Sequence, residues 1–317
     1  MTLRIPVSTF FIFLALALII QSCAFAVQAK NGFDLSEASI PSNQIFRGGP
    51  PKDGIPAIDK PRYVSADEAH SLKEDDRVLG LVIGDDARAY PIRILNWHEI
   101  VNDRIQDNAV VISFCPLCGT GMAFKASAGG TELSFGVSGL LYQSDVLMYD
   151  RQTNSLWSQI LNAAVSGPLK GQTLEQLPLQ HTSWKHWRQQ YPNTQVLSEK
   201  TGSYRDYRRD PYQGYESSPT IYFDTQHSPP KAYHPKELVL GIQIGDTSKA
   251  YPFTELSTTG MSTIQDTVEG QTLRIHWDED SGSAYATLEA GKLLATTTAY
   301  WFAWYTFHPD TLIFKAD

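Results

Sequence analysis

Two cysteines three residues apart are the strongest chemical signal in the sequence. Cys115 and Cys118 lie in the stretch FCPLCGTG, residues 114–121. A C-P-x-C-G turn can aim two thiolates at one metal ion, and Gly119 permits the backbone conformation that follows the second cysteine. The same spacing serves redox pairs, so the pattern leaves two chemistries open: metal binding and thiol–disulfide exchange.

The number of cysteines limits what this pair can do. The sequence has three cysteines, and Cys23 falls in the N-terminal leader. The remaining two cannot build a disulfide framework, and they cannot supply the four thiolates of a structural zinc ribbon. A metal ion bound here must take His, Asp, Glu or Met as its other ligands.

His98 is the preferred third ligand. It lies in NWHEIVND, within a predicted short helix over 92–100 and just before the strand that leads to Cys115. Neighbouring elements usually pack together, so we expect its imidazole near the thiols. Two thiolates and one imidazole suit zinc or copper, and three protein ligands leave a coordination position open. His308 is the second choice.

Two acidic residues are the candidates for catalysis. Glu99 follows His98 directly and can act as a base or orient a metal ligand. The second candidate, Asp145, belongs to a segment in which polar residues interrupt strand-like sequence and indicate a pocket: Ser138, Tyr142, Ser144, Asp145 and Asp150. Three arginines can bind an anionic ligand, although the acids between them indicate local pairing instead: Arg205, Arg208 and Arg209.

Composition and missing motifs exclude several functions. The net charge is −8 with no basic stripe, which argues against nucleic acid as a partner. The sequence contains no phosphate-binding loop, no H-E-x-x-H motif and no G-x-S-x-G motif. With 42% hydrophobic residues, the chain can bury a substantial core.

The N-terminus is typical of an export signal. Arg4 precedes the apolar run FFIFLALALII at 10–20, which is too short to span a bilayer. An A-x-A cleavage site follows at 24–26. Alternatively, the preceding residues resemble a lipobox, in which a lipidated Cys23 would attach the protein to a membrane. Either reading predicts an exported protein, periplasmic or extracellular.

An internal repeat places these residues in a fold. RVLGLVIGDDARAYP (77–91) and LVLGIQIGDTSKAYP (238–252) are identical at nine of fifteen positions. Farther on, SWKHWRQQYPNTQVL (183–197) matches YWFAWYTFHPDTLIF (300–314) in its tryptophans, its proline and one threonine. The repeat aligns the two cysteines with an aspartate and a serine, and it gives His98 and His308 no histidine counterpart. A feature that occurs in only one copy is not needed to form the shared fold, which indicates a functional role.

The repeat and the strand-like patterns predict the architecture. We expect a β-rich α+β fold in which two related repeat halves pack into one globular unit. The expected strands are 109–114, 120–125, 131–137, 145–149, 271–277 and 283–289. The expected organisation is a signal peptide (1–26), an N-terminal extension (27–60), repeat half one with the CPLCG site (61–197), an ordered connecting loop (198–237) and repeat half two without the cysteine pair (238–317).

Several motifs together resemble the domain-of-unknown-function 3179 family. They are HEIVND, FCPLCGTGMAF, FGVSGLLYQSDVLMYD, SLW, RDYRRDPYQGY and the closing FHPDT. The resemblance implies an exported bacterial or archaeal protein with a CPLCG motif, and it implies no particular reaction.

Three functions therefore compete. The first is an exported metal-binding protein, or a metalloenzyme, that uses Cys115, Cys118 and His98. The second is a periplasmic thiol–disulfide oxidoreductase; it is weakened because GTGMAF after the pair predicts a strand, whereas thioredoxin-type pairs begin a helix. The third is a non-catalytic binding module, for which loss of both cysteines would change stability only. A Cys-His nucleophile enzyme is a fourth and weaker option.

Overall fold

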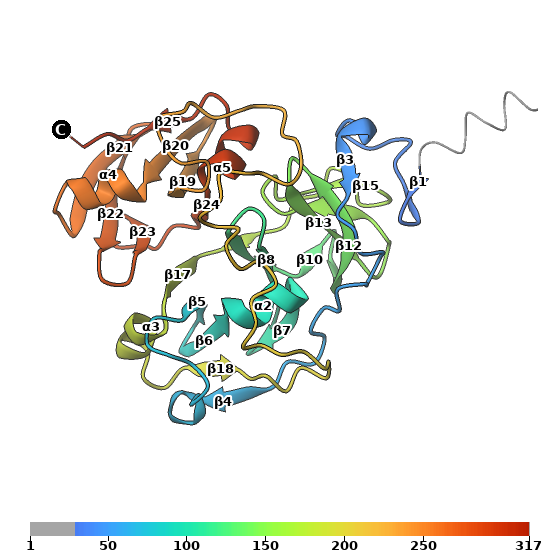
Figure 1. The fold of residues 1–317 in the computed structure, drawn as a ribbon, viewed down its shortest axis with the longest axis horizontal. Coiled ribbons are helices and arrows are strands. Elements are labelled where there is room, and N and C mark those ends of the chain that lie inside the picture. Colours follow the sequence, from blue (N-terminus) through green and yellow to red (C-terminus); the bar gives the residue numbers. More distant parts are fainter. Residues whose placement is uncertain (1–28, 317) are drawn as a thin grey trace, which may run out of the picture.

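Short antiparallel strands dominate the architecture of residues 29–316, the part of the chain that this computed structural model describes (Figure 1). This confirms the prediction of a β-rich fold with few helices. The predicted signal peptide and Cys23 lie outside the described residues. Within residues 29–316, no helix combines the length and apolar character needed to cross a membrane.

The N-terminal region and the first hairpins contribute strands to four of the sheets. The elements are β1 (Ala29–Lys30), β2 (Phe33–Asp34), the 3-10 turn η1 (Ser42–Gln44), β3 (Ile45–Arg47), β4 (Tyr63–Ser65), η2 (Ala66–Glu68), β5 (Arg77–Ile83), β6 (Asp86–Pro91), α2 (Ile92–His98), β7 (Ile100–Ile105), β8 (Asn108–Cys115) and β9 (Thr120–Lys125). The predicted helix at 92–100 and the predicted strands at 109–114 and 120–125 are thus present, each within two residues of its expected ends.

A second group of strands forms a separate five-stranded sheet, in the order β15-β14-β13-β12-β3. The elements of this region are β10 (Ser127–Ala128), β11 (Thr131–Glu132), β12 (Phe135–Tyr142), β13 (Asp145–Asp150), β14 (Leu156–Ser158), β15 (Ala163–Ser166), β16 (Gln176–Leu177), β17 (Leu179–Ser183), α3 (Trp184–Gln190) and β18 (Gln195–Leu197). The single strand predicted over 131–137 is wrong. Its first residues close a tight hairpin with β10, and its last residues begin β12, which pairs with β13.

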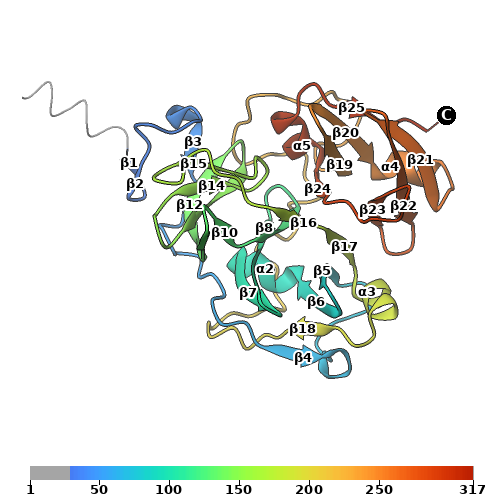
Figure 2. The same ribbon diagram turned by 180° about the vertical axis from the view of Figure 1, so that it is seen from behind.

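The C-terminal region repeats the order hairpin, short helix and three strands. It contains β19 (Leu238–Ile244), β20 (Thr247–Pro252), α4 (Phe253–Thr258), β21 (Thr263–Val268), β22 (Gln271–Asp278), β23 (Ser283–Leu288), β24 (Thr297–Tyr300), α5 (Trp301–Phe307) and β25 (Leu312–Ile313). Four of its strands, β19, β20, β24 and β25, belong to the largest sheet, ordered β25-β20-β19-β24-β9-β8-β7, so β24 joins the two regions. The other three, β21, β22 and β23, form a separate sheet. Figure 2 shows this junction from behind.

Tryptophan and glycine make the same contact in both regions. The ring of Trp187 covers Gly80, and a Cβ at Gly80 would lie 2.2 Å from a ring carbon. Trp304 covers Gly241 in the same way, again at 2.2 Å. Only glycine leaves room for such close approach of a ring to a strand.

A buried carboxylate also recurs at the positions that the sequence repeat aligns. Asp103 accepts hydrogen bonds from Tyr90 at 2.6 Å and from Arg88 at 2.5 Å. The counterpart of this carboxylate, Asp266, accepts from the Tyr251 hydroxyl at 2.8 Å and pairs with a lysine. Because both regions keep this network, we regard it as structural.

The segment between β18 and β19 has neither helix nor strand, yet it packs on the core. Tyr207 and Tyr215 are buried in it. The buried Lys236 ammonium donates to the carbonyls of Tyr215, Ser218 and Thr220 at 2.6–2.8 Å. These bonds satisfy all three donors of the lysine and fix the segment across the end of β8.

Candidate metal centre

The CPLCG turn is a strand-to-strand turn between β8 and β9. The Cys118 amide donates to the Cys115 carbonyl at 3.2 Å, and Gly119 has φ +60°. A Cβ at Gly119 would lie 2.9 Å from the ring of Tyr300, whose own amide donates to the Cys118 carbonyl at 2.8 Å. The turn therefore packs directly on β24. Both thiols are free and buried.

The hairpin of β12 and β13 brings a carboxylate to the thiols. The ligand atoms of Cys115, Cys118 and Asp145 all lie within 4.8 Å of one another, and all three residues are buried. One carboxylate oxygen of Asp145 accepts the Ile160 amide at 3.1 Å. The other oxygen, Oδ1, is buried and has no hydrogen-bond partner among the described residues. Two sulfurs and one unpaired oxygen therefore converge on one point, a donor set that can hold a metal ion.

The tip of this hairpin has an uncommon backbone. Gln143 and Ser144 form the two-residue connection, with φ of +54° and +67°. Such turns favour Asn-Gly, because both residues need positive φ. Here the conformation is held by side chains: Gln143 accepts from the Gln226 amide at 2.5 Å, and the Ser144 hydroxyl donates to the Phe223 carbonyl at 2.7 Å. The Ser144 carbonyl consequently faces the sulfurs, 3.2 Å from that of Cys118.

Burial dominates the electrostatics of the site. It raises the pKa of Asp145 from 3.8 to about 7. Burial, and then the charge of Asp145, raise the pKa of Glu99 from 4.5 to about 8. Burial also raises the pKa of the Cys118 thiol. Burial thus favours the neutral, protonated form of all three groups, and a bound metal ion would favour their charged forms.

Glu99 is the strained residue beside the centre. It follows the last residue of α2 with φ +59° and ψ −31°, which is rare for a glutamate. Its amide donates to Leu95 and its carbonyl accepts from Phe114, so both neighbouring elements hold it in this conformation. Glu99 lines a small cavity of about 70 Å³ together with Cys115 and Tyr212. Strain held in this way is typical of functional sites.

The family comparison covers this whole arrangement. A family model described as "Protein of unknown function (DUF3179)" matches residues 52–297. The chain belongs to this family. In this DUF3179 protein the matched region includes the CPLCG turn, the β12–β13 hairpin and Glu99. No curated protein and no solved structure matches the chain significantly.

In this DUF3179 protein, His98 does not join the cysteines. Its Nδ1 lies 2.7 Å from the Pro56 carbonyl and its Nε2 lies 2.7 Å from the Tyr207 hydroxyl. The side chains of His98 and Glu99 therefore point in different directions. The imidazole of His98 contacts Tyr207 of the 198–237 segment, whereas Glu99 lines a cavity with Cys115. The expected third-ligand position is therefore occupied by Asp145, not by His98.

The other predicted residues lie in ordinary structural roles. His308 packs on Trp304 with its Nδ1 3.1 Å from the Ser248 hydroxyl, away from the thiols. Asp150 binds its own turn and accepts from the Trp157 indole at 2.9 Å. Ser138 is bonded within its hairpin, Tyr142 packs on Phe307, and Arg208 pairs with Asp206.

The polar residues around Asp145 predicted a pocket, but nothing in the sequence grouped Asp145 with the two cysteines. The signal was the alternation of two apolar runs, SGLLY and DVLMY, around Gln143 and Ser144. A hairpin with this connection would present Asp145 directly after its tip. Without glycine or asparagine in the connection, however, the sequence does not display a recognisable two-residue turn.

Proposed function

We propose that this protein binds a metal ion through Cys115, Cys118 and Asp145. The observation that carries the proposal is the buried Asp145 carboxyl: one of its oxygens lies within 4.8 Å of both sulfurs, and its Oδ1 has no hydrogen-bond partner among the described residues. A buried carboxylate oxygen without a partner is costly, and a cation held with the two thiolates would remove that cost. If the position of Asp145 served the packing of the core only, an apolar residue would fill it at lower cost.

The donor set favours zinc over copper. Zinc accepts both thiolate sulfur and carboxylate oxygen and prefers four ligands. Copper(I) prefers sulfur, and the imidazole that would have supported copper(II), that of His98, is engaged elsewhere. The Ser144 carbonyl oxygen, 3.2 Å from the Cys118 sulfur, is a further oxygen that could coordinate the metal ion.

Three protein ligands leave a position for water or a substrate, which supports a metalloenzyme. Zinc bound in this way would lower the pKa of a bound water and polarise a carbonyl group. Glu99 shares the adjoining cavity with Cys115 and is the group placed to give or take a proton. Its raised pKa, about 8, lies close to neutral pH, as proton transfer requires.

We also propose that the protein works outside the cytoplasm and that its two regions are copies of one unit. The apolar leader supports export. The matching Gly80–Trp187 and Gly241–Trp304 contacts support the duplication. In the second region Asp278, the counterpart of Cys115, pairs with Ser283 just as Cys115 pairs with Thr120, so the turn is kept and the thiols are not.

Thiol–disulfide exchange is less well supported. The attacking group in such exchange is a thiolate, exposed and usually at a helix N-terminus. Here both thiols are buried in a β-turn, and burial raises the pKa of Cys118. A binding module without metal leaves the unpaired Asp145 oxygen unexplained.

The test is metal content, measured by mass spectrometry on protein purified from the exported fraction of its cells. We expect about one zinc per wild-type chain. The Cys115→Ser, Cys118→Ser double variant and Asp145→Asn should each lose it. The matched control is Asp150→Asn, which changes another buried aspartate of β13 whose oxygens are already bonded. Equal metal content in all four proteins would overturn the proposal.

A further inference from the structure

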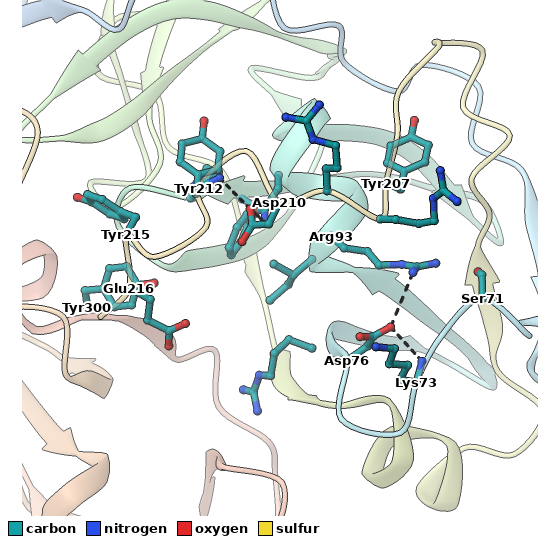
Figure 3. A pocket seen from close by; sticks show the side chains of 17 residues that line it. Ser71, Lys73, Asp76, Arg93, Tyr207, Asp210, Tyr212, Tyr215, Glu216 and Tyr300 are labelled. Atoms are coloured by element: carbon teal, nitrogen blue, oxygen red, sulfur yellow. Dashed lines mark hydrogen bonds and ion pairs between the residues drawn. The ribbon is translucent and has the colours of Figure 1, made fainter. Parts of the chain in front are cut away.

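A large cleft opens beside the metal centre, between the two regions of the chain. Its volume is about 670 Å³, and its walls come from the loop before β5, from α2, from the 198–237 segment and from β24. Figure 3 shows Tyr212, Tyr215 and Tyr300 on one side and Arg93 with Asp76 on the other. Neither the metal ligands nor Glu99 line this cleft, so the proposed metal site does not account for it.

The cleft contains hydrogen-bond donors that lack partners. Among the described residues, Nη2 of Arg77, Nε of Arg93 and the hydroxyl of Tyr215 are buried and unbonded. All three residues line the cleft. Buried donors without acceptors are rare and call for an explanation. The two guanidinium groups can only donate and the Tyr215 hydroxyl can donate as well, so a ligand that presents acceptor oxygens would satisfy all three.

The charge of the side chains that line the cleft also favours an anionic ligand. Five cationic and three acidic side chains line the cleft, although the whole chain has a net charge of −8. Of these cations, Lys73, Arg77 and Arg209 form no ion pair among the described residues, whereas Arg93 already pairs with Asp76 and Glu199. The Nη1 of Arg77 donates to the Ser281 carbonyl, and Glu216 acts on this guanidinium only from beyond ion-pair distance. An unpaired guanidinium away from water favours an anionic partner.

The second region provides an internal control. The sequence repeat aligns Arg77 with Leu238 and Arg93 with Thr254. The hollow at the corresponding turn, beside Trp277, is lined by Asp278, Glu279 and Asp280. The cationic donors therefore occur only on the side that carries the cysteines, so the fold does not require them.

We propose that this cleft binds a small ligand through an oxyanion group, a carboxylate, phosphate or sulfate, held by Arg77, Arg93 and Tyr215. An arginine fork matches two oxygens of such a group, and the phenol supplies a further donor. Because these donors are shielded from water, an oxyanion that reaches them is shielded too, which strengthens each bond.

The cleft is placed to present this ligand to the metal centre. Pro116 and Tyr212 line both the cleft and the small cavity that contains Glu99 and Cys115. An anionic substrate anchored at Arg77 would therefore lie against the turn that carries the thiols. This last step rests on the proposed metal site, whereas anion binding itself does not.

Calorimetric titration of the exported protein with inorganic phosphate, sulfate and succinate tests the proposal, with sodium chloride at equal ionic strength as the blank. We expect at least one oxyanion to bind, and the tightest of the three identifies the class. Arg77→Met should weaken binding about tenfold or more, and Tyr215→Phe, which removes one hydroxyl only, should weaken it several-fold. Arg274→Met removes the same charge from an exposed position on β22 and should leave binding unchanged.

Two results would overturn the proposal. One is the absence of any oxyanion binding above the chloride blank, and the other is equal binding by wild type and Tyr215→Phe or Arg77→Met. The Cys115→Ser, Cys118→Ser variant separates this site from the metal site. Oxyanion binding retained in that variant supports the cleft whether or not metal binds, whereas its loss would place the anion on the metal and refute the cleft.

Discussion

The thiol of Cys118 donates to the carbonyl oxygen of Ser144 at 3.2 Å, and this contact joins the two hairpins of the candidate metal centre. Ser144 holds its carbonyl there with φ +67°, a conformation that costs free energy for any residue with a side chain. The cost is met by the hydrogen bond from its hydroxyl to Phe223 at 2.7 Å. The 198–237 segment thus helps to fix the geometry of the thiols and of Asp145.

Loss of that tether should weaken metal binding. Ser144→Ala keeps the positive φ but removes the bond to Phe223, so we expect the metal affinity to fall about tenfold, as for other residues that orient ligands. Stability should fall by about 1–2 kcal/mol. The control is Ser138→Ala, which removes hydroxyl bonds elsewhere in the same hairpin. Competition with a chelator measures affinity, and equal losses in both variants would contradict a role for Ser144 at the centre.

The glycines beneath the two tryptophans should be intolerant of any side chain. A Cβ at Gly80 or at Gly241 would lie 2.2 Å from a ring carbon, so Gly80→Ala and Gly241→Ala should each destabilise the protein by about 1–3 kcal/mol or more. Trp187→Phe removes the ring atoms that would clash, so we expect it to rescue part of the loss in Gly80→Ala. Denaturant unfolding of the single and double variants measures this. Purely additive losses would mean that the contact is not the cause.

Local patterns were sufficient to predict the strands around the thiols. Apolar alternation and the turn residues Pro116 and Gly119 predicted β8, β9 and the turn between them, and the structure has all three. The matching glycine–tryptophan contacts also agree with the sequence repeat, which aligns Gly80 with Gly241 and Trp187 with Trp304.

The position of Asp145 beside the thiols could not be predicted, because it depends on backbone conformations that residue types do not reveal. Glu99 ends α2 with positive φ, which is unexpected for glutamate, so the sequence does not show how the chain passes from α2 to β7. The connection Gln143-Ser144 adopts positive φ because tertiary hydrogen bonds hold it, not because of its own preference. Tertiary contacts therefore fix the backbone at Glu99 and at Gln143-Ser144, and with it the side chain that faces the thiols.

Substitution of His98 separates the sequence-based ligand set from the structural one. His98→Asn should retain the full metal content, because both ring nitrogens are bonded to Pro56 and Tyr207 and not to a shared metal position. It should still cost about 1–3 kcal/mol of stability, since buried partners lose their bonds. Metal analysis and thermal unfolding on one preparation measure both. Metal loss equal to that of Asp145→Asn would restore His98 as a ligand.

Asp145 and Glu99 should contribute opposite pH dependences of stability to the metal-free and the zinc-bound protein. Without metal, the pKa of Asp145 is raised by burial from 3.8 to about 7, and that of Glu99 from 4.5 to about 8 by burial and the nearby Asp145. The folded chain then holds more protons than the unfolded chain between about pH 4 and pH 8. The contribution of these two carboxyls to stability is therefore greatest below this window and is lost as the pH rises through it.

Each raised carboxyl should contribute a slope of up to about 1.4 kcal/mol per pH unit within its own window. We expect chelator-treated wild type to lose stability from pH 5 to pH 8 relative to Asp145→Asn and to Glu99→Gln. The comparison with the variants removes the opposite slope of the buried histidines, whose pKa values are lowered and which all three proteins share: His98, His181 and His308. Zinc binds the deprotonated thiolates and carboxylate, so its binding releases protons and its affinity should rise over the same range. Urea unfolding at fixed pH values, with and without zinc, measures both slopes. If the metal-free wild type does not lose stability relative to the two variants from pH 5 to pH 8, the two carboxyls are not buried as acids, and the case for a cation between Asp145 and the thiols fails with it.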